Sequence, residues 1–504
     1  MTARATGDDG EDPRSRIKRL ERAASPLDPG PEERDRLMAA THGYARRFLE
    51  ELPSRLTYGA DKRAAPLVRS LEIGEGTHGI EALLERYDES VARPGIAPAH
   101  GGHLGYIPGG GLYASALADY VAAVTNEYAG VRFAGPGSVE MENQVLDWMA
   151  GLVGYPGGAE GNLASGGSIA NLIAIVAARE AAGLEARGVP DAVVYSTSHA
   201  HHCIARALRV LGLGETRVHE IPLDERFRLR AAALAAAIAE DRGAGLRPWL
   251  VIASAGTTDV GAIDPLDPIA DIAEAEGVWL HVDAAYGGFF ALLESHRAAF
   301  AGMERSHSIV LDPHKGLFLP YGVGAVLVRE GEWLRRAHAY HAHYMQDAVA
   351  EEFERSPADL SPELTKHFRG LRVWLPLLLH GLEPFRACLE EKLELARYFH
   401  AEIAARGFEV GPTPELSVAT YRWVPDSGDA NDFNRALIEH VHRDGRVFLS
   451  STMIDGVFTL RIAVLAFRTH LDTIDLTLRI LEDGVAELEA HPERWRRDLE
   501  ASRA

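Results

Sequence analysis

The pattern of apolar and polar positions changes twice along the chain and divides it into parts. The first hundred residues carry helical patterns with polar faces, as in "PEERDRLMAATHGYARRFLEEL" and "GIEALLERYDESV". From about residue 160 short apolar runs alternate with helical stretches, and after about residue 375 the pattern of apolar and polar positions changes again. We predict a disordered tip over residues 1–15, a helical segment over 16–110, a large domain over 111–375 and a small domain over 376–504.

The middle part has the pattern of an α/β domain. Its apolar runs are "AVVYST", "WLVIASAG", "VWLHVDAA", "SIVLDP" and "VGAVLVR", and Ala- and Leu-rich helical stretches separate most of them. Continuous apolar strands that alternate with helices indicate a mainly parallel sheet buried on both faces. The last part, with runs such as "SVATYRWV" and "FTLRIAVLA" between long helical patterns, predicts a smaller α+β domain.

Composition narrows the class of protein. The 504 residues carry a formal net charge of −21, which argues against binding to nucleic acid or to an anionic membrane surface. The chain has 2 cysteines, far apart, which predicts a reducing compartment and no disulfide framework. It has neither a long apolar run nor an apolar leader, so we expect a cytoplasmic protein.

Polar residues follow the predicted strands of the large domain where each strand ends. Asp283 ends one run, His314 and Lys315 follow another, and Thr257 and Thr258 follow a third. The stretch from Ser196 to His202 follows a fourth run. Because ligands of open α/β sheets bind outside the carboxyl ends of the strands, these residues predict a site at that edge.

A glycine-rich turn precedes a helical pattern in "NLASGGSIANLIAIVAARE". The free backbone N–H groups around Gly167 and Ser168 suit a phosphate, although such a turn is also a common helix cap. A lysine that forms a Schiff base, an aspartate for a pyridinium nitrogen, a phosphate loop and a histidine for the ring are what pyridoxal phosphate requires. A dinucleotide site would need G-x-G-x-x-G in the first turn, which is absent from the sequence.

Two groups of histidines leave a metal site open as an alternative. His201 and His202 are adjacent, and His338, His341 and His343 lie close together in "HAYHAHY". No cysteine or carboxylate stands beside His201 and His202 at the spacing of metal ligands, so we predict no metal.

The motifs together resemble the group II pyridoxal-phosphate-dependent amino-acid decarboxylases. "HVDAAYGG" is followed by "DPHKG", with Lys315 32 positions after Asp283 (315 − 283). "LASGGSIANL", "YSTSHAHHCIARA", "AGTTDVGAIDPL" and "HLGYIPGGG" are also similar to that family. The resemblance implies a type I pyridoxal-phosphate (aspartate aminotransferase-like) fold, a homodimer with sites at the subunit interface, and decarboxylation of an L-amino acid to an amine.

The resemblance also implies a role for individual residues. Lys315 would form the Schiff base, Asp283 would pair with the pyridine nitrogen, and Ala285 and His201 would lie against opposite faces of the ring. Further contacts with the cofactor would come from Gly167, Ser168, His314, Thr257 and Thr258. His103 and Tyr106 are candidates for the substrate pocket.

The sequence departs from the family pattern after the lysine. In the decarboxylases a tyrosine assists protonation, and the expected position falls near "ERSP", where this sequence has no tyrosine. Tyr344 is the candidate for that role, and Phe353 is the nearest other aromatic residue. Gly316 replaces a bulky aromatic residue, and we expect it to leave space beside the lysine. Oxidative aldehyde formation, transamination, C–C cleavage and a non-catalytic binding role therefore stay open as alternatives.

Overall fold

The computed structural model describes residues 12–60, 64–339 and 355–492, and the chain divides into two compact units. The first unit comprises residues 1–55 and 59–95. Its helices are α1 (Pro13–Ala24), α2 (Pro31–Glu51), α3 (Ala64–Arg69) and α4 (Ile80–Tyr87). Two short strands, β1 (Tyr58–Gly59) and β2 (Gly95–Ile96), pair with each other.

A helix cap and two ion pairs stabilise the described part of the first unit. Asp12 caps α1 by accepting a hydrogen bond from the backbone N–H of Ser15, so the helix begins inside the predicted tip of residues 1–15. Within the same unit, the carboxylate of Asp88 binds Arg55 at 2.8 Å and Arg93 at 2.5 Å.

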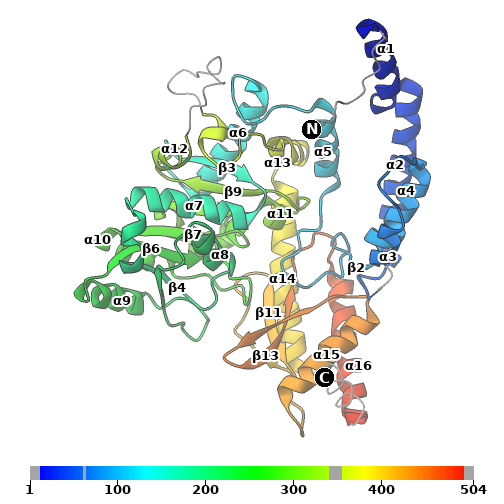
Figure 1. The fold of residues 1–504 in the computed structure, drawn as a ribbon. Coiled ribbons are helices and arrows are strands. Elements are labelled where there is room, and N and C mark those ends of the chain that lie inside the picture. The colour runs from blue at the N-terminus through cyan, green and yellow to red at the C-terminus, as the bar shows by residue number, and fades with distance from the viewer. Residues whose placement is uncertain (1–11, 61–63, 340–354, 493–504) are drawn as a thin grey trace, which may run out of the picture. The chain divides into compact units, whose positions relative to one another are not determined.

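The second unit, residues 56–58 and 96–504, contains a seven-stranded sheet in the order β3-β9-β8-β7-β6-β4-β5 (Figure 1). The strands are β3 (Glu160–Ala164), β4 (Ala192–Ser196), β5 (Arg217–Glu220), β6 (Arg247–Ser254), β7 (Trp279–Asp283), β8 (Ser308–Leu311) and β9 (Gly324–Val328). The strands β5, β4, β6, β7 and β8 are neighbours in this order and run parallel, and β9 runs antiparallel to both β8 and β3. The predicted mainly parallel sheet is confirmed.

The sheet includes two strands that the apolar pattern did not predict. β5 has exposed residues at three of its four positions, so it has no apolar run. β3 is buried, but its sequence EGNLA holds glycine and asparagine instead of branched apolar residues. Both are edge strands, where side-chain burial decides the sequence less strongly than in the centre.

Helices cover both faces of this sheet, which explains its continuous apolar strands. Alternate strand residues such as Val194, Ile252 and Val310 pack with α7, α8 and α12. The residues between them, such as Val193, Val251 and Ile309, pack with α6, α9 and α10. The helices of the large domain are α5 (Tyr113–Thr125), α6 (Pro136–Val153), α7 (Gly167–Ala181), α8 (Cys203–Val210), α9 (Ala231–Gly243), α10 (Leu266–Glu276), α11 (Pro313–Gly316) and α12 (Glu332–His338).

The C-terminal part has its own antiparallel sheet and its own apolar core. The sheet has the order β10-β11-β13-β12, from β10 (Glu409–Val410), β11 (Val418–Arg422), β12 (Ser450–Ile454) and β13 (Val457–Ala463). Its helices are α13 (Arg369–His380), α14 (Glu383–Ala405), α15 (Ala430–Asp444) and α16 (Leu471–Ala490). Residue 375 falls inside α13, and the domain boundaries at 110 and 375 stay predictions.

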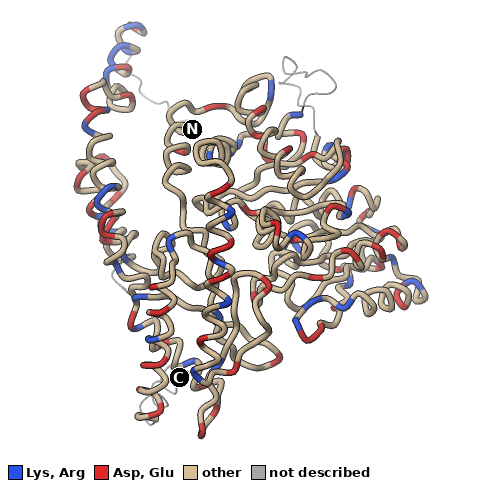
Figure 2. Tube along the Cα trace, turned by 180° about the vertical axis from the view of Figure 1, so that it is seen from behind, with Lys and Arg blue, Asp and Glu red and all other residues tan. Residues whose placement is uncertain are grey.

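The distribution of charge and the apolar character of the helices are two further features of the described chain. Figure 2 shows acidic and basic positions interspersed along the trace of the described chain. Among the helices that the structure describes, none combines the length and apolar character needed to cross a bilayer.

Candidate active site

A cavity of about 280 Å³ opens at the carboxyl ends of the parallel strands in the large domain. Its volume is near the lower end of small-molecule sites, which are roughly 300–1,000 Å³. All of the predicted cofactor-binding residues line it: Gly167, Ser168, His201, Thr257, Thr258, Asp283, Ala285, His314 and Lys315. The strand ends therefore meet as the sequence predicted.

Lys315 lies in the short helix α11, directly after β8. Its Nζ atom is 3.0 Å from Oδ2 of Asp312, whose side chain is 1% exposed. Burial lowers the pKa of Lys315, but the charges of Asp312 and Asp283 oppose this effect, and the net shift is upward. His314 turns its Nδ1 atom to the backbone carbonyl of Val323, and burial lowers the pKa of its imidazole.

The turn between β3 and α7 requires glycine for steric reasons. Gly166 has φ +149°, and a Cβ atom there would lie 3.2 Å from Cε1 of His314. A Cβ atom on Gly167 would lie 2.7 Å from Oδ2 of Asp312 and 3.2 Å from Cβ of Ala285. Because α7 starts at Gly167, the N–H groups of its first two residues have no acceptor within the helix and can bind an anion.

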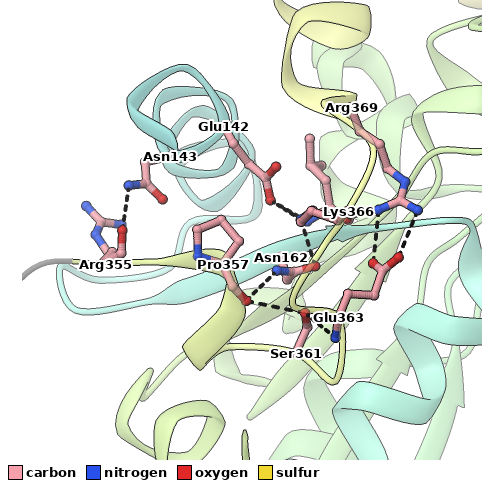
Figure 3. A network of polar contacts seen from close by, with 10 residues as sticks. Glu142, Asn143, Asn162, Arg355, Pro357, Ser361, Glu363, Lys366 and Arg369 are labelled. Atoms are coloured by element: carbon pink, nitrogen blue, oxygen red, sulfur yellow. Dashed lines mark hydrogen bonds and ion pairs between the residues drawn. The ribbon is translucent and has the colours of Figure 1, made fainter. Parts of the chain in front are cut away.

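Three charged side chains hold the strand that leads into this turn (Figure 3). Oε1 of Glu142 accepts hydrogen bonds from the backbone N–H of Leu163 at 3.1 Å and from Nζ of Lys366 at 2.7 Å. Arg369 donates to the backbone carbonyl of Leu163 at 3.2 Å. β3 is an edge strand, so Glu142 and Arg369 satisfy backbone groups of Leu163, which lies just before the glycine turn.

Asp283 ends β7 and is held by donors on its inner side. Its Oδ1 atom accepts from the backbone N–H of Ala285 at 3.1 Å, and Oδ2 accepts from Nδ2 of Asn171 at 3.3 Å. The amide of Asn171 also donates to the carbonyl oxygen of Gly167 at 2.9 Å, so α7 connects the aspartate to the glycine turn.

Residues from other strand ends complete the cavity. His201 accepts a hydrogen bond from the backbone N–H of Cys203 at 3.3 Å, and burial lowers the pKa of its imidazole. Burial also raises the pKa of the Cys203 thiol to about 12, which makes it an inert neutral packer. Thr257 accepts a hydrogen bond from the backbone N–H of Ala262 at 3.1 Å, so the loop after β6 is closed on itself.

Several residues that the sequence singled out lie elsewhere. His103 is 2% exposed and contacts the rings of Tyr106 and Phe448, and Tyr106 is 58% exposed; neither is among the described residues that line the cavity. Their role in the substrate pocket stays a prediction. Tyr344 and Phe353 lie outside the described residues, as do His341 and His343.

The expectation that Gly316 leaves free space beside the lysine is wrong. A Cβ atom on Gly316 would lie 2.7 Å from Cβ of Phe289 and 3.2 Å from its Cδ2. The ring of Phe289, which stacks on Trp148, occupies that position. Glycine at 316 is therefore explained by close packing against a neighbouring segment.

Four lining residues that matter for the geometry were not predicted from the sequence: Asn171, Cys203, Tyr286 and Asp312. Asp312 had a usable signal, because it is the first polar residue after the buried strand β8. Asn171 also had one, because it lies one helical turn after Gly167, on the same face of α7.

The residues present fit pyridoxal phosphate. The fit rests on a cradle that a Cβ atom would fill at Gly166 and Gly167, and on a buried lysine nitrogen that faces the same cavity. It also rests on Asp312, whose Oδ1 atom is buried without a hydrogen-bond partner among the described residues. Such unpaired buried atoms are rare and often mark a functional site.

Comparison with known proteins agrees with this fit. The family model described as "Pyridoxal-dependent decarboxylase conserved domain" matches residues 75–423. An aromatic-L-amino-acid decarboxylase of Bacillus atrophaeus is 35% identical over 376 residues, 73% of this chain and 78% of that protein. A phenylacetaldehyde synthase of Petunia hybrida is 29% identical over 401 residues, 75% of this chain and 79% of that protein.

The fold also has a solved counterpart. A crystal structure of Oryza sativa TDC with PLP and tryptamine superposes with a TM-score of 0.86, covering 92% of this chain and 99% of that chain at 22% identity. The type I fold is thereby confirmed. The chain belongs to the pyridoxal-dependent decarboxylases, enzymes that use pyridoxal phosphate to release CO₂ from an amino acid.

Proposed function

We propose that this chain decarboxylates an L-amino acid to the corresponding amine, with Lys315 as the residue that binds the cofactor covalently. The observation that carries the proposal is the cavity itself. It brings Lys315, Asp283, His201 and the glycine turn together from four separate strand ends. When bound, pyridoxal phosphate accepts the electron pair that CO₂ leaves behind.

The positions of the surrounding residues support the following roles. The carboxylate of Asp283 would accept from the ring nitrogen, and the N–H groups of Gly167 and Ser168 would donate to the phosphate. We assign His201 and Ala285 to the ring, and His314, Thr257 and Thr258 to the edge of the site.

Lys315 must lose a proton before its nitrogen can attack a carbonyl carbon. Oδ2 of Asp312 is 3.0 Å from Nζ, so its charge holds that proton on the lysine and sets how readily it leaves. Its companion Oδ1 has no hydrogen bond among the described residues, so the carboxylate has free capacity to accept.

The substrate class is part of the proposal. The relative at 35% identity is an aromatic-L-amino-acid decarboxylase, so we propose aromatic L-amino acids as the first class to test. Purified protein with pyridoxal phosphate is incubated with the twenty amino acids while CO₂, ammonia and peroxide are followed. Release of CO₂ without peroxide supports the proposal, and no product from any amino acid contradicts it.

Oxidative aldehyde formation is the second candidate. It is favoured by the absence of tyrosine near Arg355–Pro357, where Ser356 is buried and accepts a hydrogen bond from the backbone N–H of Arg132. The phenylacetaldehyde synthase among the relatives supports the same candidate. Release of ammonia and peroxide together with CO₂ in the same assay would favour it over simple decarboxylation.

We also propose a homodimer in the cytoplasm. The dimer is supported by an exposed apolar stripe at helical spacing along α5, formed by Tyr113, Leu117, Tyr120, Val121 and Val124. The location is supported by the free cysteines Cys203 and Cys388. Sedimentation of the wild type and of Leu117→Asp tests this proposal. The wild type should sediment as a dimer, and Leu117→Asp should show a larger monomer fraction.

A further inference from the structure

A continuous line of buried polar side chains connects Asp283 to Trp279. Nδ2 of Asn171 is 3.3 Å from Oδ2 of Asp283, and Oδ1 of Asn171 is 2.7 Å from Nε2 of His281. Nδ1 of His281 is 2.8 Å from Oγ of Ser308, which is 2.9 Å from Nε1 of Trp279. Every one of these residues is buried, with His281 and Ser308 fully inaccessible.

The strand geometry brings these side chains into one line. Trp279, His281 and Asp283 are alternate residues of β7 and therefore point to the same face of the sheet. Ser308 is the register partner of His281 on the neighbouring strand β8. Asn171 comes from α7, which packs on that face with Trp279 in the same apolar cluster.

The chemistry of the end groups is compatible with one direction of donation along the line. The indole of Trp279 can only donate, so Ser308 accepts from it and can donate its own proton onward to Nδ1 of His281. Burial lowers the pKa of His281 to about 4, so its ring is neutral at pH 7 and carries one N–H. With Nδ1 as acceptor, that N–H is on Nε2 and donates to Oδ1 of Asn171.

The orientation of Asn171 agrees independently with this direction. Its Nδ2 atom donates to the carbonyl oxygen of Gly167 at 2.9 Å, and in this orientation Oδ1 faces the histidine. The other tautomer of His281 would place a lone pair against Oδ1 at 2.7 Å. That repulsion would weaken the hold on the amide that keeps Nδ2 toward Asp283.

We propose that His281 is a positioning residue, which through Asn171 fixes the carboxylate of Asp283 as the acceptor for the ring nitrogen of the cofactor. This inference rests on the proposed function, because it assigns Asp283 to that nitrogen. His281 itself does not line the cavity, so it acts on the ring only through Asn171 and Asp283. A carboxylate supplied with an N–H donor on its inner side keeps its remaining lone pairs toward the cavity.

The experiment compares two substitutions of equal length at one position. His281→Gln keeps an N–H donor for Asn171, whereas His281→Met has a similar shape and lacks the donor. Each holoenzyme is prepared with pyridoxal phosphate that is ¹⁵N-labelled in the ring. The ring-nitrogen chemical shift is then measured against pH, together with the dissociation constant of the cofactor.

We expect a protonated ring nitrogen in the wild type and in His281→Gln. In His281→Met the ring nitrogen should lose its proton at lower pH, and the cofactor should bind roughly 10-fold more weakly or worse. Equal shifts and equal affinities in the two variants would overturn the inference while the proposed function stands. A wild type that binds no cofactor would overturn the proposed function, and this inference with it.

A second measurement needs no variant and covers the case in which a substituted protein fails to fold. Neutron diffraction from crystals of the wild-type holoenzyme locates the hydrogen atoms on His281 and on Asn171. A hydrogen on Nε2 with the Asn171 amide toward Asp283 supports the proposal. A hydrogen on Nδ1 alone, or an Asn171 oxygen toward Asp283, overturns it.

Discussion

Nζ of Lys315 lies 3.0 Å from Oδ2 of Asp312, three positions earlier in the chain, and this ion pair is almost closed to water at the aspartate. Burial alone would lower the pKa of the lysine, but the charges of Asp312 and Asp283 reverse the effect. Lys315 is therefore held as an ammonium ion until a proton leaves it. We therefore expect Asp312 to control how readily the lysine becomes a nucleophile.

Asp312→Asn tests this control. The substitution keeps the shape of the side chain and removes its charge, so the pKa of Lys315 should fall and its neutral fraction at pH 7 should rise. The rate at which the apoprotein forms its visible cofactor band, followed by stopped-flow absorbance across pH, should reach its plateau at lower pH than in the wild type. Lys315→Ala is the control and should show no such band. An unchanged pH profile in Asp312→Asn would remove Asp312 from this role.

The glycine turn gives a second prediction. In Gly167→Ala the new Cβ atom would lie 2.7 Å from Oδ2 of Asp312, so either the carboxylate or the turn must move. We expect cofactor affinity to fall by about 10-fold or more, since such displacement corresponds to at least roughly 1–3 kcal/mol. The affinity is measured by titration of the apoprotein with pyridoxal phosphate.

Gly151→Ala is the matched control for this substitution. Gly151 lies inside α6, and a Cβ atom there would meet no described atom within 4 Å beyond the backbone of its own helix. The change should leave cofactor affinity unaltered and should stabilise the protein by about 0.5–1 kcal/mol, because alanine favours a helix interior. A similar loss of affinity in both variants would contradict the steric explanation for Gly167.

The central strands and many residues that line the cavity could be predicted because one signal governs both. A parallel strand buried on both faces must be apolar until it ends, so the first polar residues after it mark the edge of the sheet. Lys315, Asp283 and Thr257 were found in this way. The same signal is missing from β3, where glycine and asparagine occupy an edge strand held by side chains rather than by a second neighbour.

Pairings between distant segments could not be predicted from the sequence. Glu142 and Lys366 are far apart in the chain, and neither has a local pattern that identifies its partner. The packing of Phe289 against Gly316 could not be predicted for the same reason, because close packing between segments depends on the folded backbone. His281 is an intermediate case. A histidine within a buried apolar strand predicts that a polar partner is present, but the sequence does not identify which residue that partner is.

The buried ion pair next to the glycine turn gives a third prediction. The side chains of Lys366 and Glu142 are 0% and 1% exposed, and their charged atoms are 2.7 Å apart. Lys366→Met leaves the carboxylate of Glu142 buried without its counter-ion, so the free energy of unfolding should fall by about 3–5 kcal/mol. Urea unfolding measures the change.

Two further variants separate this effect from a general loss of charge. Lys366→Met combined with Glu142→Gln removes both charges and should recover part of the stability. Arg187→Met breaks the exposed pair with Glu185, in which the side chains are 87% and 69% exposed, and should cost less than about 1 kcal/mol. A double variant that is less stable than Lys366→Met alone would contradict the prediction.

The stability of the protein toward acid provides the last prediction, through His103. Burial lowers the pKa of His103 to about 4, whereas a histidine in the unfolded chain titrates near 6.5. Between these values the unfolded state binds more protons, so stability rises with pH there and is lost as the pH falls from 6.5 toward 4. His103→Phe keeps an aromatic ring beside those of Tyr106 and Phe448 and cannot titrate. From pH 8 to pH 5.5 the wild type should therefore lose about 1.4 kcal/mol more than the variant. Urea unfolding at both pH values measures this difference, and the comparison at pH 8 isolates the effect of packing. Equal losses in the two proteins would mean that His103 is protonated equally in the folded and unfolded states.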